Sequence, residues 1–222
     1  ELKENNFYKL STHKKSAFNP YLILPEQNKP QNRINILSLP IAHNALGLQS
    51  IGYDHPLSAP LLLASYCIKN KILHTEIREK GGAYGSGAKY SPLTALFQFY
   101  SYRDPNISRT YKMFQEACHI SLKEGFSDEE LLEAKLGYFS DAEGSTPPAA
   151  RAYNTYANEM GGLDLQTRQN YKQKVLDTTK EQVLLAIKEH LLPHFREGCF
   201  ISYANEKMAQ NAKDEIGEQI EL

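Results

Sequence analysis

Two neighbouring strand-like segments near the middle of the chain constrain its fold more than any other feature. In residues 94–104, Phe97 and Phe99 alternate with more polar neighbours, as expected for a strand with one buried face. The glycine-rich residues 82–90 resemble a second strand, and only a short turn around Ser91–Pro92 separates the two. Strands joined by so short a turn pair antiparallel, so this region predicts an antiparallel sheet whose apolar face must be covered.

Helical patterns surround this strand pair in long runs. Residues 55–80 predict one helix followed by a shorter one, and capping boxes at 127–130 and 179–182 predict the starts of two later helices. Further strands are predicted within residues 34–51 and at 199–204. Because strands and helices segregate into runs, we expect an α+β fold with two layers, an antiparallel sheet with helices packed on one face.

The apolar patterning begins at Ile34, and a chain of 222 residues with 41% hydrophobic content can bury one sizeable core. We therefore expect a single domain over residues 34–222. Residues 1–33 are polar and interrupted by three prolines, which predicts an extended lead-in or linker. The chain begins with Glu1 and no signal-like apolar segment, so we expect it to be part of a longer polypeptide.

Charge and cysteine content exclude several classes of partner. The formal net charge is −1, so no overall attraction to nucleic acid or to an anionic membrane is expected. No apolar run approaches the ~20 residues that span a bilayer. Cys67, Cys118 and Cys199 are scattered without a CxxC pair, which favours buried thiols in a reducing compartment inside the cell. That compartment would be the cytoplasm of a bacterium or the matrix of a eukaryotic organelle.

The segment IREKGGAYGSG, residues 77–87, carries the strongest chemical signal. Its glycines let a backbone approach closely, and a helix end followed by a strand could bring Arg78 and Tyr84 to one spot. There their donors could grip a peptide carbonyl or a developing oxyanion. The alternative is structural, with Gly81–Gly82 as a helix C-cap, Tyr84 as a half-buried strand residue and Arg78 as a solvated charge. A phosphate loop is not indicated, because the GxxxxGK[ST] spacing is missing.

This segment resembles the C-terminal half of the pitrilysin/insulinase-like zinc metallopeptidases, in particular the presequence-protease branch. That family has an Arg six residues before a Tyr in the context RxKGGAYG, which residues 78–85 match position by position. The specific motif is confined to residues 73–87, and the broader resemblance covers residues 34–215.

The resemblance implies a larger enzyme. Such proteases consist of two homologous halves that close as a clamshell around a chamber, each half with two related α+β domains, and this chain would be the last of the four. By transfer, Arg78 and Tyr84 are the catalytic pair that contacts the substrate backbone near the scissile bond. Gly82, Ala83 and Gly85 would let the substrate strand approach. The implied partners are a short unstructured peptide as substrate and the N-terminal half of the same protease.

The sequence provides no zinc site of its own. The family's zinc motif, HxxEH, does not occur in this chain, and the resemblance implies that zinc is held by the N-terminal half. His190 and His194 have the spacing of two ligands on a helix, but Pro193 lies between them, which favours a solvated helix end over a metal site. We therefore expect the chain to be inactive alone. The alternative is a catalytically inactive scaffold, like the core proteins of respiratory complexes, although a scaffold has no need of the Arg78–Tyr84 pair.

Overall fold

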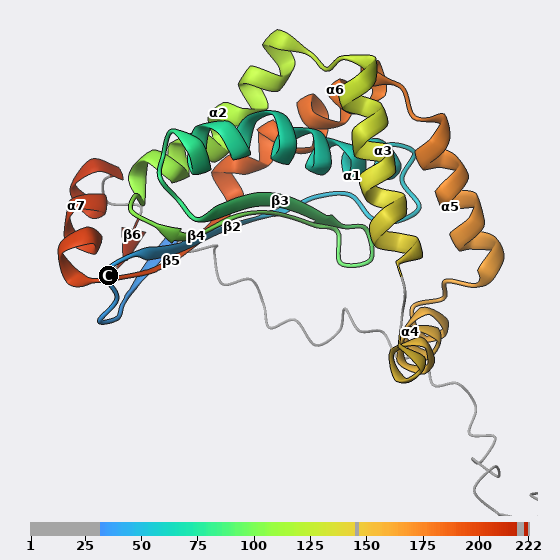
Figure 1. Cartoon of the computed structure of the whole chain (residues 1–222), viewed down its shortest axis with the longest axis horizontal. Helices are drawn as coiled ribbons and strands as arrows, with labels where there is room; N and C mark the ends of the chain where they lie inside the picture. The colour runs from blue at the N-terminus through green and yellow to red at the C-terminus, as the bar shows by residue number, and fades with distance from the viewer. Residues whose placement is uncertain (1–31, 145–146, 217–219, 222) are drawn as a thin grey trace, which may run out of the picture.

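The computed structural model describes residues 32–144, 147–216 and 220–221, and it shows a sheet with a layer of helices on one face (Figure 1). The six strands lie in the order β3-β4-β2-β5-β1-β6. Their bounds are β1 (Asn32–Ile36), β2 (Ala42–Gln49), β3 (Gly85–Ser91), β4 (Leu96–Asp104), β5 (Cys199–Ala204) and β6 (Ile220–Glu221).

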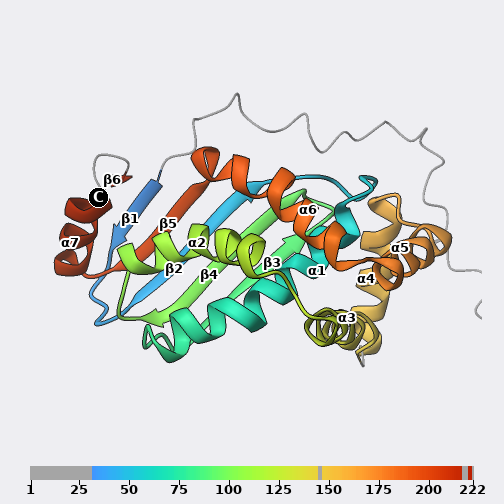
Figure 2. The same ribbon diagram turned by 90° about the horizontal axis from the view of Figure 1, so that it is seen from above.

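The helices fall into a central group and two ends. α1, α2 and α6 lie across the sheet, α3, α4 and α5 gather at one end, and α7 lies at the other end beside β1 (Figure 2). No helix within the described ranges is long and apolar enough to cross a bilayer. The helical elements are α1 (Ser58–Ile68), the π-helix η3 (Lys69–Glu79), α2 (Ser108–Glu124), α3 (Asp128–Glu143), α4 (Pro148–Met160), α5 (Leu165–Asp177), α6 (Lys180–His190), the 3₁₀-helix η4 (Leu192–Glu197) and α7 (Glu206–Ile216).

The predicted two-layer α+β class is confirmed, with one difference in the sheet. β3, β4, β2 and β5 pair antiparallel as expected, whereas β1 runs parallel to β5 and β6 parallel to β1. β5 enters the sheet between β1 and β2, so the two consecutive N-terminal strands do not pair. β1 begins at Asn32, two residues before the predicted domain boundary. The rest of the predicted lead-in, residues 1–31, lies outside the described residues.

Alternating apolar residues of the central strands build the core against the helices. On β2, Leu46 and Leu48 are buried on the helix-covered face, and on β4 so are Phe97 and Phe99. The ring of Phe99 stacks on that of Phe114 from α2, with 5.3 Å between centroids. The alternation predicted for residues 94–104 therefore identified the buried face of β4.

A buried carboxylate joins the end of β4 to the start of α2. Asp104 is fully buried and accepts hydrogen bonds from the hydroxyls of Ser101 at 2.6 Å and Thr110 at 2.7 Å. It also accepts one from the backbone N–H of Asn106 at 2.8 Å and a longer one from the Asn44 amide at 3.3 Å. These donors compensate the buried charge, and they fix the segment that lies behind the candidate site.

Candidate functional site

The structure brings four of the five predicted site residues to one place. Arg78, Gly82, Ala83 and Tyr84 line an open depression of about 560 Å³ where η3 ends and β3 begins. Gly85 does not line it. The remaining lining residues, which the sequence analysis did not identify, are His74, Glu79 and Arg103.

The glycine pair ends the helix as predicted, and it turns the chain toward β3. The backbone N–H of Gly82 donates to the Arg78 carbonyl at 3.0 Å, and that of Ala83 donates to the Ile77 carbonyl at 3.1 Å. Gly82 has φ +80°, in the left-handed region that glycine adopts without a steric penalty. The next residue, Tyr84, donates its N–H to the Arg103 carbonyl at 3.2 Å, which places it beside the end of β4.

Side chains at and just before the start of α2 donate hydrogen bonds to carbonyls at the end of η3. Asn106 Nδ2 donates to the Gly81 carbonyl at 2.8 Å. The Arg109 guanidinium donates to the carbonyls of Lys80 at 3.2 Å and Glu76 at 3.4 Å. The last carbonyls of a helix have no partners within it, so these bonds fix the position of the turn that carries Arg78 and Tyr84.

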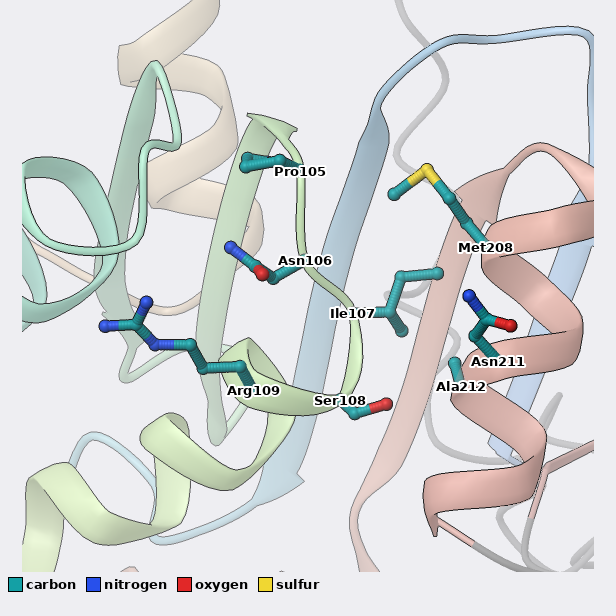
Figure 3. A pocket seen from close by; sticks show the side chains of 8 residues that line it. All are labelled: Pro105, Asn106, Ile107, Ser108, Arg109, Met208, Asn211 and Ala212. Carbon is teal, nitrogen blue, oxygen red and sulfur yellow. The ribbon is translucent and has the colours of Figure 1, made fainter.

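A second cavity lies beside the two residues that donate these hydrogen bonds, Asn106 and Arg109. It has a volume of about 300 Å³ and lies between the start of α2 and α7 (Figure 3). Asn106 and Arg109 line it, but their hydrogen bonds connect them to the end of η3. The other lining residues are Pro105, Ile107, Ser108, Met208, Asn211 and Ala212.

Tyr84 is an exposed tyrosine that lines the depression. The residue is 62% exposed, and its ring has two aromatic or cationic neighbours. The Tyr102 ring lies 5.7 Å away, centroid to centroid, and the guanidinium of Arg103 lies 5.3 Å from the ring centroid. Arg103 has φ +48°, an uncommon conformation for a residue with a side chain. Within the described part of the chain the Tyr84 hydroxyl has no hydrogen-bond partner, so it can donate to a ligand.

Arg78 is also exposed, and one of its two terminal nitrogens has a partner. Arg78 Nη1 lies 2.9 Å from Nε2 of His74, and Nδ1 of the same ring lies 3.4 Å from a carboxylate oxygen of Glu79. The i,i+4 spacing of His74 and Arg78 is a signal that could have found this contact in the sequence. The β3–β4 pairing that places Arg103 opposite Tyr84 could not be read from it.

The packing of a neighbouring side chain explains why position 85 is a glycine, whereas the sequence analysis expected the approach of a substrate strand to explain it. A Cβ at Gly85 would lie 2.3 Å from the ring of Tyr102, its partner on β4, and a Cβ at Gly87 would lie 2.5 Å from the Tyr100 hydroxyl. The tyrosine rings therefore cover these glycines on the sheet face away from the helices. The contact between Gly85 and a substrate stays a prediction.

The described residues do not fit a zinc site. They contain no group of three His, Cys, Asp or Glu residues placed to hold a metal ion. α6 ends at His190, but this side chain is only 18% exposed, so the prediction of a solvated helix end is wrong for it. Its ring packs edge-on against His55, with centroids 4.7 Å apart, because the loop before α1 folds against the end of α6.

Two of the three cysteines are poor candidates for a nucleophile. Cys67 and Cys118 are buried and unpaired, as predicted for small core side chains, whereas Cys199 is partly exposed. Burial raises the pKa of Cys67 to about 12 and also raises the pKa of Cys118. Both thiols therefore stay protonated at neutral pH, and a protonated thiol is a poor nucleophile.

Comparisons with known proteins identify the family of this chain. Residues 35–187 match the family described as PreP C-terminal domain. The chain is 34% identical over 177 residues to the mitochondrial presequence protease of Yarrowia lipolytica, covering 80% of this chain and 18% of that protein. It is 37% identical over 174 residues to the mitochondrial presequence protease of Aspergillus fumigatus, covering 77% and 16%.

One solved structure shows the same fold. The peptidase M16 inactive domain from Pseudomonas fluorescens superposes with a TM-score of 0.59 at 22% identity, covering 82% of this chain and 46% of that chain. The present chain spans less than a fifth of the length of the two curated relatives, the presequence proteases of Yarrowia lipolytica and Aspergillus fumigatus. The chain belongs to the PreP C-terminal domain family, within the presequence-protease branch of the pitrilysin/insulinase-like zinc metallopeptidases.

Proposed function

We propose that this domain completes the active site of a presequence-protease-type peptidase and holds the backbone of an unstructured peptide. The observation that supports this most is that Arg78 and Tyr84 line one open depression and that both residues are exposed. Gly82 and Ala83 present little side chain there, which leaves room for an extended peptide.

The chemistry of the depression suits a peptide carbonyl. An arginine fork and a phenolic hydroxyl both donate hydrogen bonds, and a scissile carbonyl gains negative charge as it is attacked. Two donors fixed around that oxygen would stabilise the transition state more than the ground state, which accelerates the reaction. Arg78 and Tyr84 are therefore the proposed catalytic residues of this domain.

The rest of the site is proposed to come from the N-terminal half of the same protease. That half would hold the zinc ion, since the residues described here do not form such a site. The domain alone would then be inactive, and its partners would be the N-terminal half and a short peptide. The two curated relatives are named mitochondrial, which favours an organelle matrix as the compartment.

The test is cleavage of a quenched, unstructured peptide by the complete protease and by this chain alone. Arg78→Ala and Tyr84→Phe should each lower kcat/KM by about 10²-fold, as loss of an oxyanion donor does. Tyr153→Phe is the matched control, because Tyr153 is an exposed tyrosine on α4, outside the depression. Unchanged turnover in both Arg78→Ala and Tyr84→Phe would contradict the proposal. If the complete protein does not cleave the peptide, the result would favour the scaffold function.

A further inference from the structure

His74 connects two charged residues at the rim of the depression. Its Nε2 lies 2.9 Å from Arg78 Nη1, and its Nδ1 lies 3.4 Å from Glu79 Oε1. The three side chains line the depression together with Arg103 and Tyr84. His74 is about half exposed, so the contact is not forced by packing in the core.

The π-helical winding of η3 explains how one histidine reaches both neighbours. The N–H of Lys80 donates to the carbonyl of Thr75, five residues earlier, at 2.9 Å. In an α-helix the fourth residue along lies beside a given side chain, whereas the fifth has rotated away from it. Because a π-helix closes its turns on the fifth residue, Arg78 and Glu79 both flank His74.

The chemistry of the three groups fixes their hydrogen-bonding roles. A guanidinium has donors and no acceptor, so Arg78 must donate and Nε2 of His74 must accept. The ring proton of the neutral imidazole then resides on Nδ1, which faces the Glu79 carboxylate. The carboxylate favours this tautomer, in which Nε2 is free to accept from arginine.

We propose that His74 is a positioning residue that holds the Arg78 guanidinium in the orientation that receives the substrate. This inference rests on the proposed function of Arg78. A solvent-exposed arginine has many rotamers, and a single acceptor at Nη1 limits them while Nη2 and Nε keep their donors for a peptide carbonyl. The depression's other arginine, Arg103, lies instead against the ring of Tyr84.

The first experiment compares two substitutions of His74 in the complete protease with the quenched peptide. His74→Ala removes the acceptor and should lower kcat about three- to tenfold, the effect of losing one hydrogen bond, with KM changed less than about twofold. His74→Gln should recover most of kcat, because its amide oxygen can accept from Arg78. His119→Ala, an exposed histidine on α2 outside the depression, is the matched control. Equal losses of kcat in the Ala and Gln variants would overturn the inference.

The second experiment asks whether His74 acts through Arg78. In an Arg78→Ala background, adding His74→Ala should cause no further loss, because the group that it positions is already absent. A further loss equal to that of the single His74→Ala variant would also overturn the inference. If Arg78→Ala itself leaves turnover unchanged, the proposed function fails. If only the His74 variants are silent, the proposed function stands and the positioning role is wrong.

Discussion

At the scale of single residues, the two glycines that end η3 are required for different physical reasons. A Cβ at Gly81 would lie 2.4 Å from the carbonyl oxygen of Ile77, which is a backbone clash. Gly82 has open space around it, since the closest contact of an added Cβ would be Pro105 at an ordinary 3.5 Å. Its requirement comes from φ +80° alone. The motif thus combines a packing constraint and a conformational one in consecutive residues.

Gly82→Ala should therefore destabilise the fold through backbone strain. The left-handed conformation costs a residue with a side chain about 1–2 kcal/mol, so the free energy of unfolding should fall by about that amount. Urea denaturation followed by circular dichroism measures it. Gly52→Ala is the control, since an added Cβ there meets nothing within 4 Å and should leave stability unchanged or slightly higher. Equal effects of the two substitutions would contradict the conformational explanation.

At the scale of elements, the site depends on the junction of η3, β3 and α2. The start of α2 is fixed by the hydrogen bonds of Asp104, and Asn106 from the same segment holds the Gly81 carbonyl. The turn that carries Arg78 and Tyr84 is thus connected to residues about 25 positions later in the chain. A change in α2 can therefore move the site without touching a residue in the depression.

Asn106→Ala tests this connection. Loss of its side chain leaves the Gly81 carbonyl without its donor, and the free energy of unfolding should fall by about 1–2 kcal/mol. Asn211→Ala is the matched control, because Asn211 lines the same cavity from α7 and is exposed (Figure 3). Chemical denaturation of the two variants gives the comparison, and equal stabilities would show that the Asn106 bond contributes nothing.

Local chemistry explains which elements could be predicted from the sequence. Both predicted capping boxes form, at Ser127 with Glu130 and at Thr179 with Gln182, because each depends on residues three positions apart. The parallel pairing of β1 with β5 joins residues that are about 170 positions apart in the sequence, so no local sequence pattern could predict it. The winding of residues 69–79 was also missed, because apolar spacing indicates a helix but not whether its bonds close on the fourth or the fifth residue.

In the candidate site, too, some residues could be predicted from the sequence and others could not. Arg78 and Tyr84 were predicted from a short motif, and the structure places both in one depression. Arg103 joins them only because β3 pairs with β4 in one register, with Gly85 opposite Tyr102. Glu79 meets His74 because the helix is π-wound, whereas the contact of His74 with Arg78 has the ordinary i,i+4 spacing. Arg103 and Glu79 therefore depend on tertiary or winding geometry, which the motif does not specify.

At the scale of the whole molecule, two histidines from distant parts of the sequence pack against each other. His190 ends α6, and its ring packs against His55 in the loop that precedes α1. The Ser50 hydroxyl, just after β2, donates to the His190 carbonyl at 3.1 Å. The His190 Nε2 is buried and has no hydrogen-bond partner among the residues that the structure describes, while a Glu189 carboxylate oxygen lies 4.0 Å from it. A charge on this ring would therefore be poorly solvated in the folded state.

This packing predicts a loss of stability in acid. Burial, with a smaller contribution from His55, lowers the pKa of His190 below its ordinary 6.5. The unfolded chain then binds a proton more readily than the folded one, so this contribution to stability is complete above pH 6.5 and declines as the pH falls through that value toward the lower folded pKa. Urea unfolding at a series of pH values should show this decline, and His190→Gln, which cannot gain a charge, should reduce it. An identical pH dependence in the variant would assign the acid sensitivity to other groups.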